Sequence, residues 1–216
     1  MTLRMKRTII LTIVLVGCLQ VALAQNTIES IRKAYQAQQA EIAEMAEDFP
    51  YDGYPPCYYQ LSVVMNLPAT GLHRENIRMY FGEMAQDDED NYNPYPPHYL
   101  SFLTTKYNYA AREFYEEYLY DKDGQVMFIY AQTPDIDMSC MHELRLYFDG
   151  QKLLRLNVKK SDDLKSYDDT AIKVAGFKDV FTGTSIPEAY KEFCDMYQKK
   201  AQQYLSMFNS IDGTVY

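Results

Sequence analysis

Apolar and polar positions alternate most regularly between Tyr99 and Lys159. Such alternation is typical of strands whose two faces meet different surroundings. Asp-Gly stands twice between alternating runs, as Asp123-Gly124 and Asp149-Gly150. This pair is favoured in type I′ hairpin turns, because both central residues of such a turn need a positive φ. The stretch therefore predicts an antiparallel meander with one covered face and one wetter face.

Two segments outside the meander have helical spacing. Residues 26–47 form the first, in which Asn26 can cap the helix with Glu29 three residues on. The second runs from Pro187 to about Asn209, and its continuous apolar stripe is typical of a helix packed on a sheet. The stripe comprises Tyr190, Phe193, Cys194, Tyr197, Ala201, Tyr204, Leu205 and Phe208.

Shorter elements complete the pattern. A strand is expected at Cys57–Leu67, a second strand or short helix near Asn76–Phe81, and a short strand within Ile172–Phe181. Tyr-Pro-Pro precedes an apolar run at 54–56 and again at 95–97. A duplicated hairpin unit would explain the repeat, but two rigid polyproline II entries to a strand explain it more simply.

The predicted fold class is thus α+β. It is an antiparallel β-meander of five or more strands, with an N-terminal and a C-terminal helix packed on one face of the sheet. The length suits a single domain.

The N-terminus has the three parts of a secretory signal peptide. Arg4, Lys6 and Arg7 form a basic start, an apolar run follows, and Ala22-Leu23-Ala24 is a small-residue cleavage site. We expect residues 1–24 to be removed and residues 25–216 to form one periplasmic or extracellular domain. Leu15-Val16-Gly17-Cys18 also fits a lipoprotein box, so a lipid anchor at Cys18 in the outer membrane is the alternative. No later apolar run reaches bilayer length, which predicts no membrane span.

The net charge argues against two classes of binding partner. The formal charge of −9 becomes −12 once the three cations of residues 1–24 are removed. Nucleic acid and anionic membrane surfaces demand basic patches, so neither is an expected partner.

Cysteine and histidine carry the candidate chemistry. Cys57, Cys140 and Cys194 follow residue 24, and a disulfide between Cys57 and Cys140 is one arrangement that their odd number allows. Cys194 lies on the helix stripe and reads as a buried hydrophobe. None of the three histidines stands in a metal-ligand pattern, and the acidic run 87–91 lacks EF-hand spacing, so neither a metal nor a cofactor is expected.

Cys140 and His142 are two positions apart, which suggests a thiol nucleophile with a base. On one strand, however, their side chains would share a face at about 7 Å, too far for direct proton transfer. A hydrolase with a cleft near these two residues is therefore the alternative function.

Tyrosine is the unusual feature, with 21 Tyr, 10 Phe and no Trp. Tyrosine suits wet interfaces with proteins or glycans, although its β-propensity is the plainer explanation. The meander holds more tyrosines than a core needs, which predicts an exposed tyrosine face. The ligand-binding candidates are Tyr109, Tyr115, Tyr118, Tyr130 and Tyr147. The leading hypothesis is a non-enzymatic secreted binding module for a protein or glycan, and a purely structural envelope component is a third.

The cleavage site Ala24-Gln25 followed by the meanders YDKDGQVMFIY and ELRLYFDGQKLLRL is similar to small secreted proteins of unknown function from Gram-negative gut bacteria. The similarity lies in the sequence pattern of strands and turns, and it implies no functional residues.

Overall fold

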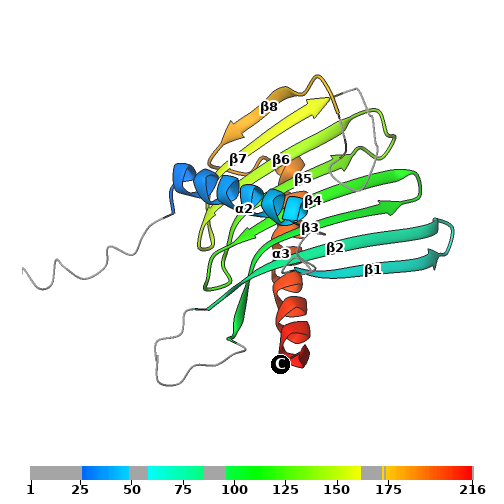
Figure 1. Cartoon of the computed structure of the whole chain (residues 1–216). Coiled ribbons are helices and arrows are strands. Elements are labelled where there is room, and N and C mark those ends of the chain that lie inside the picture. Colours follow the sequence, from blue (N-terminus) through cyan, green and yellow to red (C-terminus); the bar gives the residue numbers. More distant parts are fainter. Residues whose placement is uncertain (1–25, 49–57, 85–95, 162–171, 173, 216) are drawn as a thin grey trace, which may run out of the picture.

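The computed structural model describes residues 26–48, 58–84, 96–161, 172 and 174–215. They form one eight-stranded antiparallel sheet and two helices (Figure 1). The elements are α2 (Ile28–Asp48), β1 (Tyr58–Leu67), β2 (Gly71–Glu83), β3 (His98–Tyr109), β4 (Arg112–Tyr120), β5 (Val126–Pro134), β6 (Met141–Asp149), β7 (Lys152–Ser161), β8 (Lys178–Gly183) and α3 (Glu188–Val215).

The strands lie in the sheet in the order of the sequence, so each pairs with the next. The predicted α+β class and the meander of five or more strands are confirmed. The segment expected as a strand or short helix near Asn76–Phe81 is the middle of β2, which is longer at both ends. In the segment 172–181, the strand is β8 and begins only at Lys178.

The two helices lie on opposite faces of the sheet, so the expectation that both pack on one face is wrong. Figure 1 shows α2 in front of the sheet and α3 behind it. Adjacent residues of β5 explain why: Phe128 packs with α2 and Ile129 packs with α3. Both side chains are buried, because a helix covers each face of the central strands. We call these surfaces the α2 face and the α3 face.

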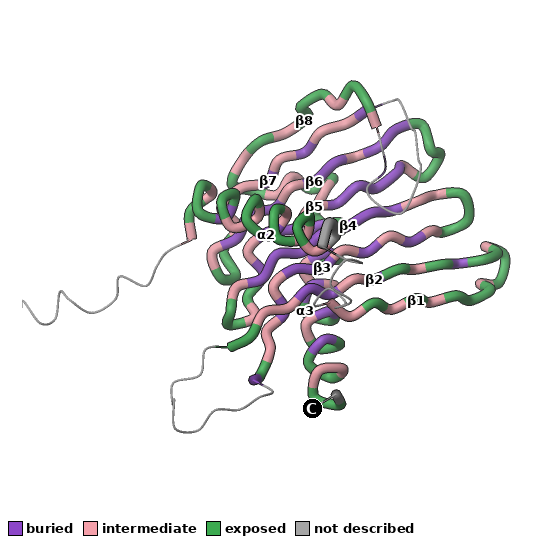
Figure 2. The backbone as a smooth tube through the Cα atoms, viewed as in Figure 1, coloured by how far each residue is buried: buried purple, intermediate pink, exposed green. Residues whose placement is uncertain are grey.

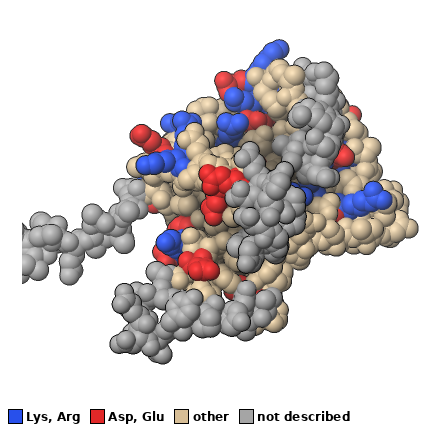
Figure 3. Space-filling view, in the orientation of Figure 1, with Lys and Arg blue, Asp and Glu red and all other residues tan. Residues whose placement is uncertain are grey.

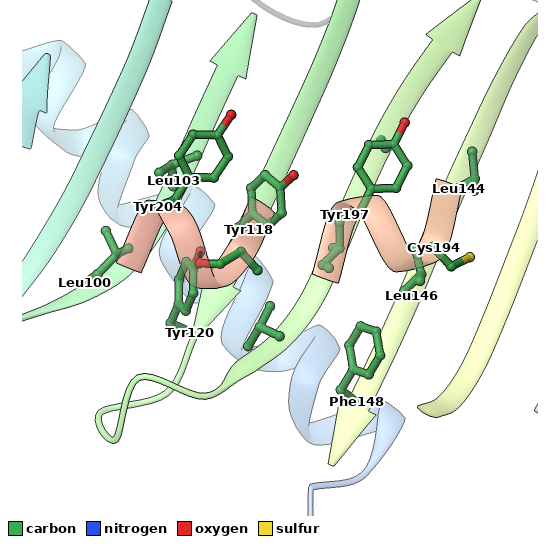
Figure 4. Packing of buried hydrophobic residues seen from close by; sticks show 14 of the residues in the cluster. Leu100, Leu103, Tyr118, Tyr120, Leu144, Leu146, Phe148, Cys194, Tyr197 and Tyr204 are labelled. Carbon is green, nitrogen blue, oxygen red and sulfur yellow. Dashed lines mark hydrogen bonds between the residues drawn. The ribbon is translucent and has the colours of Figure 1, made fainter. Parts of the chain in front are cut away.

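The larger core lies on the α3 face. Figure 4 shows α3 crossing the strands, with Cys194 beside Leu146 at one end and Tyr204 beside Tyr118 at the other. Figure 2 shows the buried residues concentrated in the central strands, whereas β1 and β8 at the edges carry few. Burying a leucine or phenylalanine side chain stabilises by roughly 1.5–3 kcal/mol, so this face supplies most of the apolar stabilisation.

Both predicted Asp-Gly hairpins are present, but neither turn is type I′. Asp123 and Asp149 lack the positive φ that a type I′ turn needs, and only the glycines have it, with φ of 76° at Gly124 and 57° at Gly150. Asp149 pairs with Lys152, which leaves Gly150 as the first residue of a two-residue loop, where type II′ turns place glycine. The glycine alone therefore supplies the turn conformation.

The two turn glycines are expected to differ in their response to alanine. Gly150→Ala should lower the free energy of unfolding by about 1–2 kcal/mol, the cost of a left-handed conformation. Gly124→Ala should cost more, because the added Cβ would also lie 3.0 Å from the Leu205 side chain. Urea denaturation measures both. Leu205→Ala in the Gly124→Ala background should remove the excess, and equal costs for the two glycines would contradict this packing.

Candidate functional site

A groove of about 540 Å³ lies beside α2 on the α2 face of the sheet. We call it the aromatic groove. It is lined by Ile31, Arg32, Tyr35, Gln36, Glu117, Phe128, Tyr130, Arg145 and Tyr147. Ligand sites are typically concave and combine apolar or aromatic walls with a few polar groups. Five of the nine lining residues here are apolar or aromatic and four are charged or polar.

The pairing register of three neighbouring strands aligns the residues that form the floor of the groove. Glu117 of β4 lies directly opposite Tyr130 of β5, and Tyr130 lies directly opposite Arg145 of β6. Phe128 and Tyr147 form the next pair along the same strands. Since directly opposite residues share a face, these side chains form a continuous row across the sheet.

The helix completes the groove through Tyr35. Its ring packs edge-on against Phe102 and Phe128, with centroids 6.0 and 5.2 Å away. Its hydroxyl donates a hydrogen bond of 2.7 Å to Oε2 of Glu117. Tyr35 thus belongs to the hydrophobic contact of α2 with the sheet and to the polar floor at the same time.

Two buried carboxyl groups are held by tyrosine hydroxyls. Glu117 Oε1 accepts a hydrogen bond of 2.8 Å from Tyr115, and Glu143 Oε2 accepts one of 3.1 Å from Tyr130. The Arg145 guanidinium lies 3.1 Å from Oε1 of Glu143. Buried charges cost free energy unless they are paired and hydrogen-bonded. Glu143 has an ion pair and a hydrogen bond, and Glu117 accepts two hydrogen bonds.

Burial raises the pKa of Glu117, although the hydrogen bonds from Tyr35 and Tyr115 and the charge of Arg145 act in the opposite direction. Burial and the neighbouring carboxyl groups also raise the pKa of Tyr35 and of Tyr130. The phenols therefore remain protonated and keep donating, while the acid at the floor retains its proton to a higher pH than an exposed glutamate.

Glu117 should make stability depend on pH. Because its pKa is raised on folding, the folded protein holds this proton more tightly than the unfolded chain. The contribution of this proton to stability is full below the pKa of the unfolded chain, near 4.5. It is lost as the pH rises through the raised pKa of the folded protein. Relative to Glu117→Gln, the wild type should thus lose stability as the pH rises from 4.5, measured by urea denaturation across that range. Glu29→Gln, on the exposed side of α2, controls for the lost charge, and parallel curves for wild type and Glu117→Gln would contradict the prediction.

Cationic groups lie at the rim of the aromatic groove. The guanidinium of Arg32 lies 5.7 Å from the centre of the Tyr147 ring, and that of Arg145 lies 5.5 Å from the centre of the Tyr130 ring. Figure 3 shows acidic and basic side chains interspersed on this side of the molecule. The groove therefore combines aromatic walls, two cations at the rim and a buried acid at the floor.

A second hollow of about 540 Å³ lies on the same face over β2, β3 and β4. Its lining is more polar and includes Arg74, Asn76, Lys106 and Glu113. Lys106 and Glu113 form a loose ion pair of 3.9 Å across it. Two aromatic residues, Tyr107 and Tyr115, line it, against four in the first groove, so it is the weaker candidate.

The five tyrosines proposed from the sequence do not share one face. Tyr130 and Tyr147 line the aromatic groove, and Tyr115 lies below it with its hydroxyl on Glu117. Tyr118 is fully buried on the α3 face and donates to Glu116, so its place at an exposed face is wrong. Tyr109 is exposed on that same opposite face, beside His73. Side chains alternate between the two faces along β4, so Tyr115 and Tyr118 lie on opposite faces of the sheet. The number of tyrosines in the meander does not reveal which face each one occupies.

The sequence reasoning missed Tyr35, Glu117 and the two arginines of the groove. A local signal was present for Glu117, which stands beside Tyr118 in the run YEEY, but nothing local connects it with Tyr35, 82 positions earlier. Only the docking of α2 on the sheet brings the two together.

Cys140 and His142 are much closer than the expected 7 Å. The Sγ atom of Cys140 lies 3.4 Å from Nε2 of His142 and 3.6 Å from Oδ2 of Asp135. Cys140 precedes the first residue of β6 and belongs to the turn, so the spacing rule for strands does not apply to it. Cys140 is a free, buried thiol. Cys57, the other cysteine of the possible disulfide, lies outside the described residues.

Comparison with models of protein families, with curated proteins and with solved structures found no match to this chain. Within the described part of the chain, no helix is both long enough and apolar enough to cross a membrane. The segment predicted to be a signal peptide, Cys18 and the acidic run 87–91 lie outside the described residues.

Proposed function

We propose that the protein is a non-enzymatic, exported binding module and that the aromatic groove is its ligand site. The observation that carries the proposal is the row of Glu117, Tyr130 and Arg145 across three strands, with Tyr35 of α2 fixed over it by a hydrogen bond. These polar groups are held in place by main-chain register and by buried hydrogen bonds. Such preorganisation lowers the entropic cost of binding.

The lining points to a ligand that is flat or apolar on one side and polar at its edge. Tyrosine rings take up the flat side of a sugar or a peptide side chain, and the hydroxyls and guanidinium groups at the rim take up its polar groups. A glycan or an exposed peptide segment of a protein partner has this chemistry. The net negative charge of the chain is consistent with such partners and disfavours nucleic acid.

Arrays of immobilised glycans and peptides, probed with the labelled protein, test this proposal. The expected result is retention by a defined glycan or peptide. Tyr130→Ala should lower the affinity for it by about 2 kcal/mol or more, which is about thirtyfold, as is usual for a central aromatic contact. Tyr109→Ala removes an exposed tyrosine from the opposite face and is the matched control.

Circular dichroism and thermal unfolding of the variants show whether the fold is intact. Binding that is retained by a folded Tyr130→Ala variant, or that is lost equally in Tyr109→Ala, would place the ligand elsewhere. If Tyr130→Ala does not fold, Arg32→Ala gives the same test, because Arg32 is exposed at the rim.

The contact of Cys140 with His142 favours one further candidate, a thiol hydrolase. In a nucleophile relay, a carboxylate orients the imidazole through the nitrogen that faces away from the thiol. Here Asp135 approaches the sulfur itself, and Nδ1 of His142 has no hydrogen-bond partner among the described residues. The binding module is therefore the better supported function, and retained turnover in Cys140→Ala would eliminate the thiol mechanism.

A further inference from the structure

Three side chains of different chemistry converge where β5 passes into β6. Asp135 follows the last residue of β5, Cys140 precedes the first residue of β6, and His142 is the second residue of β6. The main-chain N–H of Asp135 donates a hydrogen bond of 3.0 Å to the carbonyl of Cys140. This bond closes the loop and holds Asp135 and Cys140 side by side.

Two of the three donor-atom separations in this cluster fit a common central ion, and the third is at most 4.8 Å. The sulfur lies 3.4 Å from Nε2 of His142 and 3.6 Å from Oδ2 of Asp135, and the three donor atoms all lie within 4.8 Å of one another. Zinc bonds of about 2.3 Å to sulfur and about 2.0–2.2 Å to nitrogen or oxygen place tetrahedral ligands about 3.5 Å apart. The two sulfur distances match that separation.

The remaining atoms of the cluster leave these three donors available. Oδ1 of Asp135 accepts a hydrogen bond of 2.8 Å from the N–H of Ile136, so Oδ2 is the oxygen that faces the sulfur. Nε2 of His142 faces the sulfur, and Nδ1 of the same ring has no hydrogen-bond partner among the described residues.

We propose that Asp135, Cys140 and His142 form a binding site for a transition-metal ion of the zinc type. A thiolate, an imidazole and a carboxylate together are the ligand types of zinc, whereas calcium and magnesium take oxygen ligands. Three protein ligands leave one tetrahedral position for water or for a group from another molecule. The proposal rests on different residues from the aromatic groove, so either can fail without the other.

Cobalt is the probe for this site, because Co²⁺ takes up zinc geometry and absorbs visible light. The purified protein is reduced with a phosphine, freed of metal with EDTA and titrated with Co²⁺. The expected result is one ion per chain, with the near-ultraviolet band of a thiolate–cobalt bond and the strong visible bands of tetrahedral coordination. Added Zn²⁺ should remove both sets of bands by competition.

Variants locate the ion. Cys140→Ala should abolish the thiolate–cobalt band, and Asp135→Asn should weaken binding by at least about tenfold, since even outer-shell changes cost 10–100-fold. Asp137→Asn is the matched control, because Asp137 lies in the same loop and its Oδ1 accepts the N–H of Ser139. Cys194→Ala is the control for the second buried thiol. Neither control should change the titration.

A wild-type protein that shows no thiolate–cobalt band overturns the proposal without reference to any variant. A band that survives in Cys140→Ala, or that disappears in Cys194→Ala, overturns it as well. The wild-type titration can refute the proposal by itself, so the test still works if a variant fails to fold.

Discussion

Replacing Glu116 with alanine is expected to lower the free energy of unfolding by about 3–5 kcal/mol, the usual cost of breaking a buried ion pair. Glu116 is fully buried on the α3 face. Its carboxylate accepts hydrogen bonds of 2.6 Å from the hydroxyls of both Tyr107 and Tyr118, and the Lys200 ammonium lies 2.5 Å from it. The variant would leave a cation and two hydroxyls without their acceptor in the core.

The same variant tests how α3 is anchored, because Lys200 belongs to that helix. Urea denaturation of Glu116→Ala, of Lys200→Met and of the double variant Glu116→Gln/Lys200→Met gives the comparison. The double variant should be more stable than Glu116→Ala, because it removes both charges together. A loss below about 1 kcal/mol in Glu116→Ala, which is typical of a surface pair, would contradict the buried contact.

Phe208→Ala is expected to have an effect of similar size, about 3–5 kcal/mol, because it opens a cavity in the core of the α3 face. Phe208 is fully buried, and its ring centre lies 5.9 Å from that of Tyr59 and 6.0 Å from that of Phe81. It therefore joins the C-terminal half of α3 to β1 and β2, at one edge of the sheet.

Thermal and urea unfolding measure this loss, and Met207→Ala is the matched control. Met207 is the preceding residue of the same helix and is 37% exposed, so its removal should cost far less. Equal effects for the two variants would mean that α3 does not pack with Phe208 toward the sheet.

Much of the fold could be predicted from the sequence, because its signals are local. Gly124 and Gly150 mark the two hairpins, and the stripe that includes Cys194, Tyr197 and Phe208 marks the helix that covers the α3 face. Each of these features depends only on neighbouring residues. Alternation and helical spacing are therefore sufficient to recover the order of the elements.

The faces of the sheet could not be predicted in the same way. Alternation in β6 separates Leu144 and Leu146 from Arg145 and Tyr147, which made the second set appear solvent-exposed. In the structure Tyr147 is only 3% exposed, since α2 covers it. Whether a half-polar face is wet or covered depends on where a distant helix docks, and local patterning does not specify this.

The candidate site depends on such long-range contacts throughout. Tyr130 and Tyr147 were proposed because they are tyrosines of the meander, whereas Tyr118 met the same criterion and is part of the core. Cys140 and His142 were paired from the sequence, but their separation was overestimated and Asp135 was not included. The reason is that a strand spacing was assumed for a residue that lies in a turn.

NMR can locate the ligand in the aromatic groove. Amide and side-chain spectra of the isotope-labelled protein are recorded with and without the glycan or peptide retained on the arrays. We expect shifts at Tyr35, Phe128, Tyr130 and Tyr147, with α3 unaffected. Shifts confined to α3 or to the loop from Asp135 to His142, with the groove unchanged, would refute the proposed ligand site.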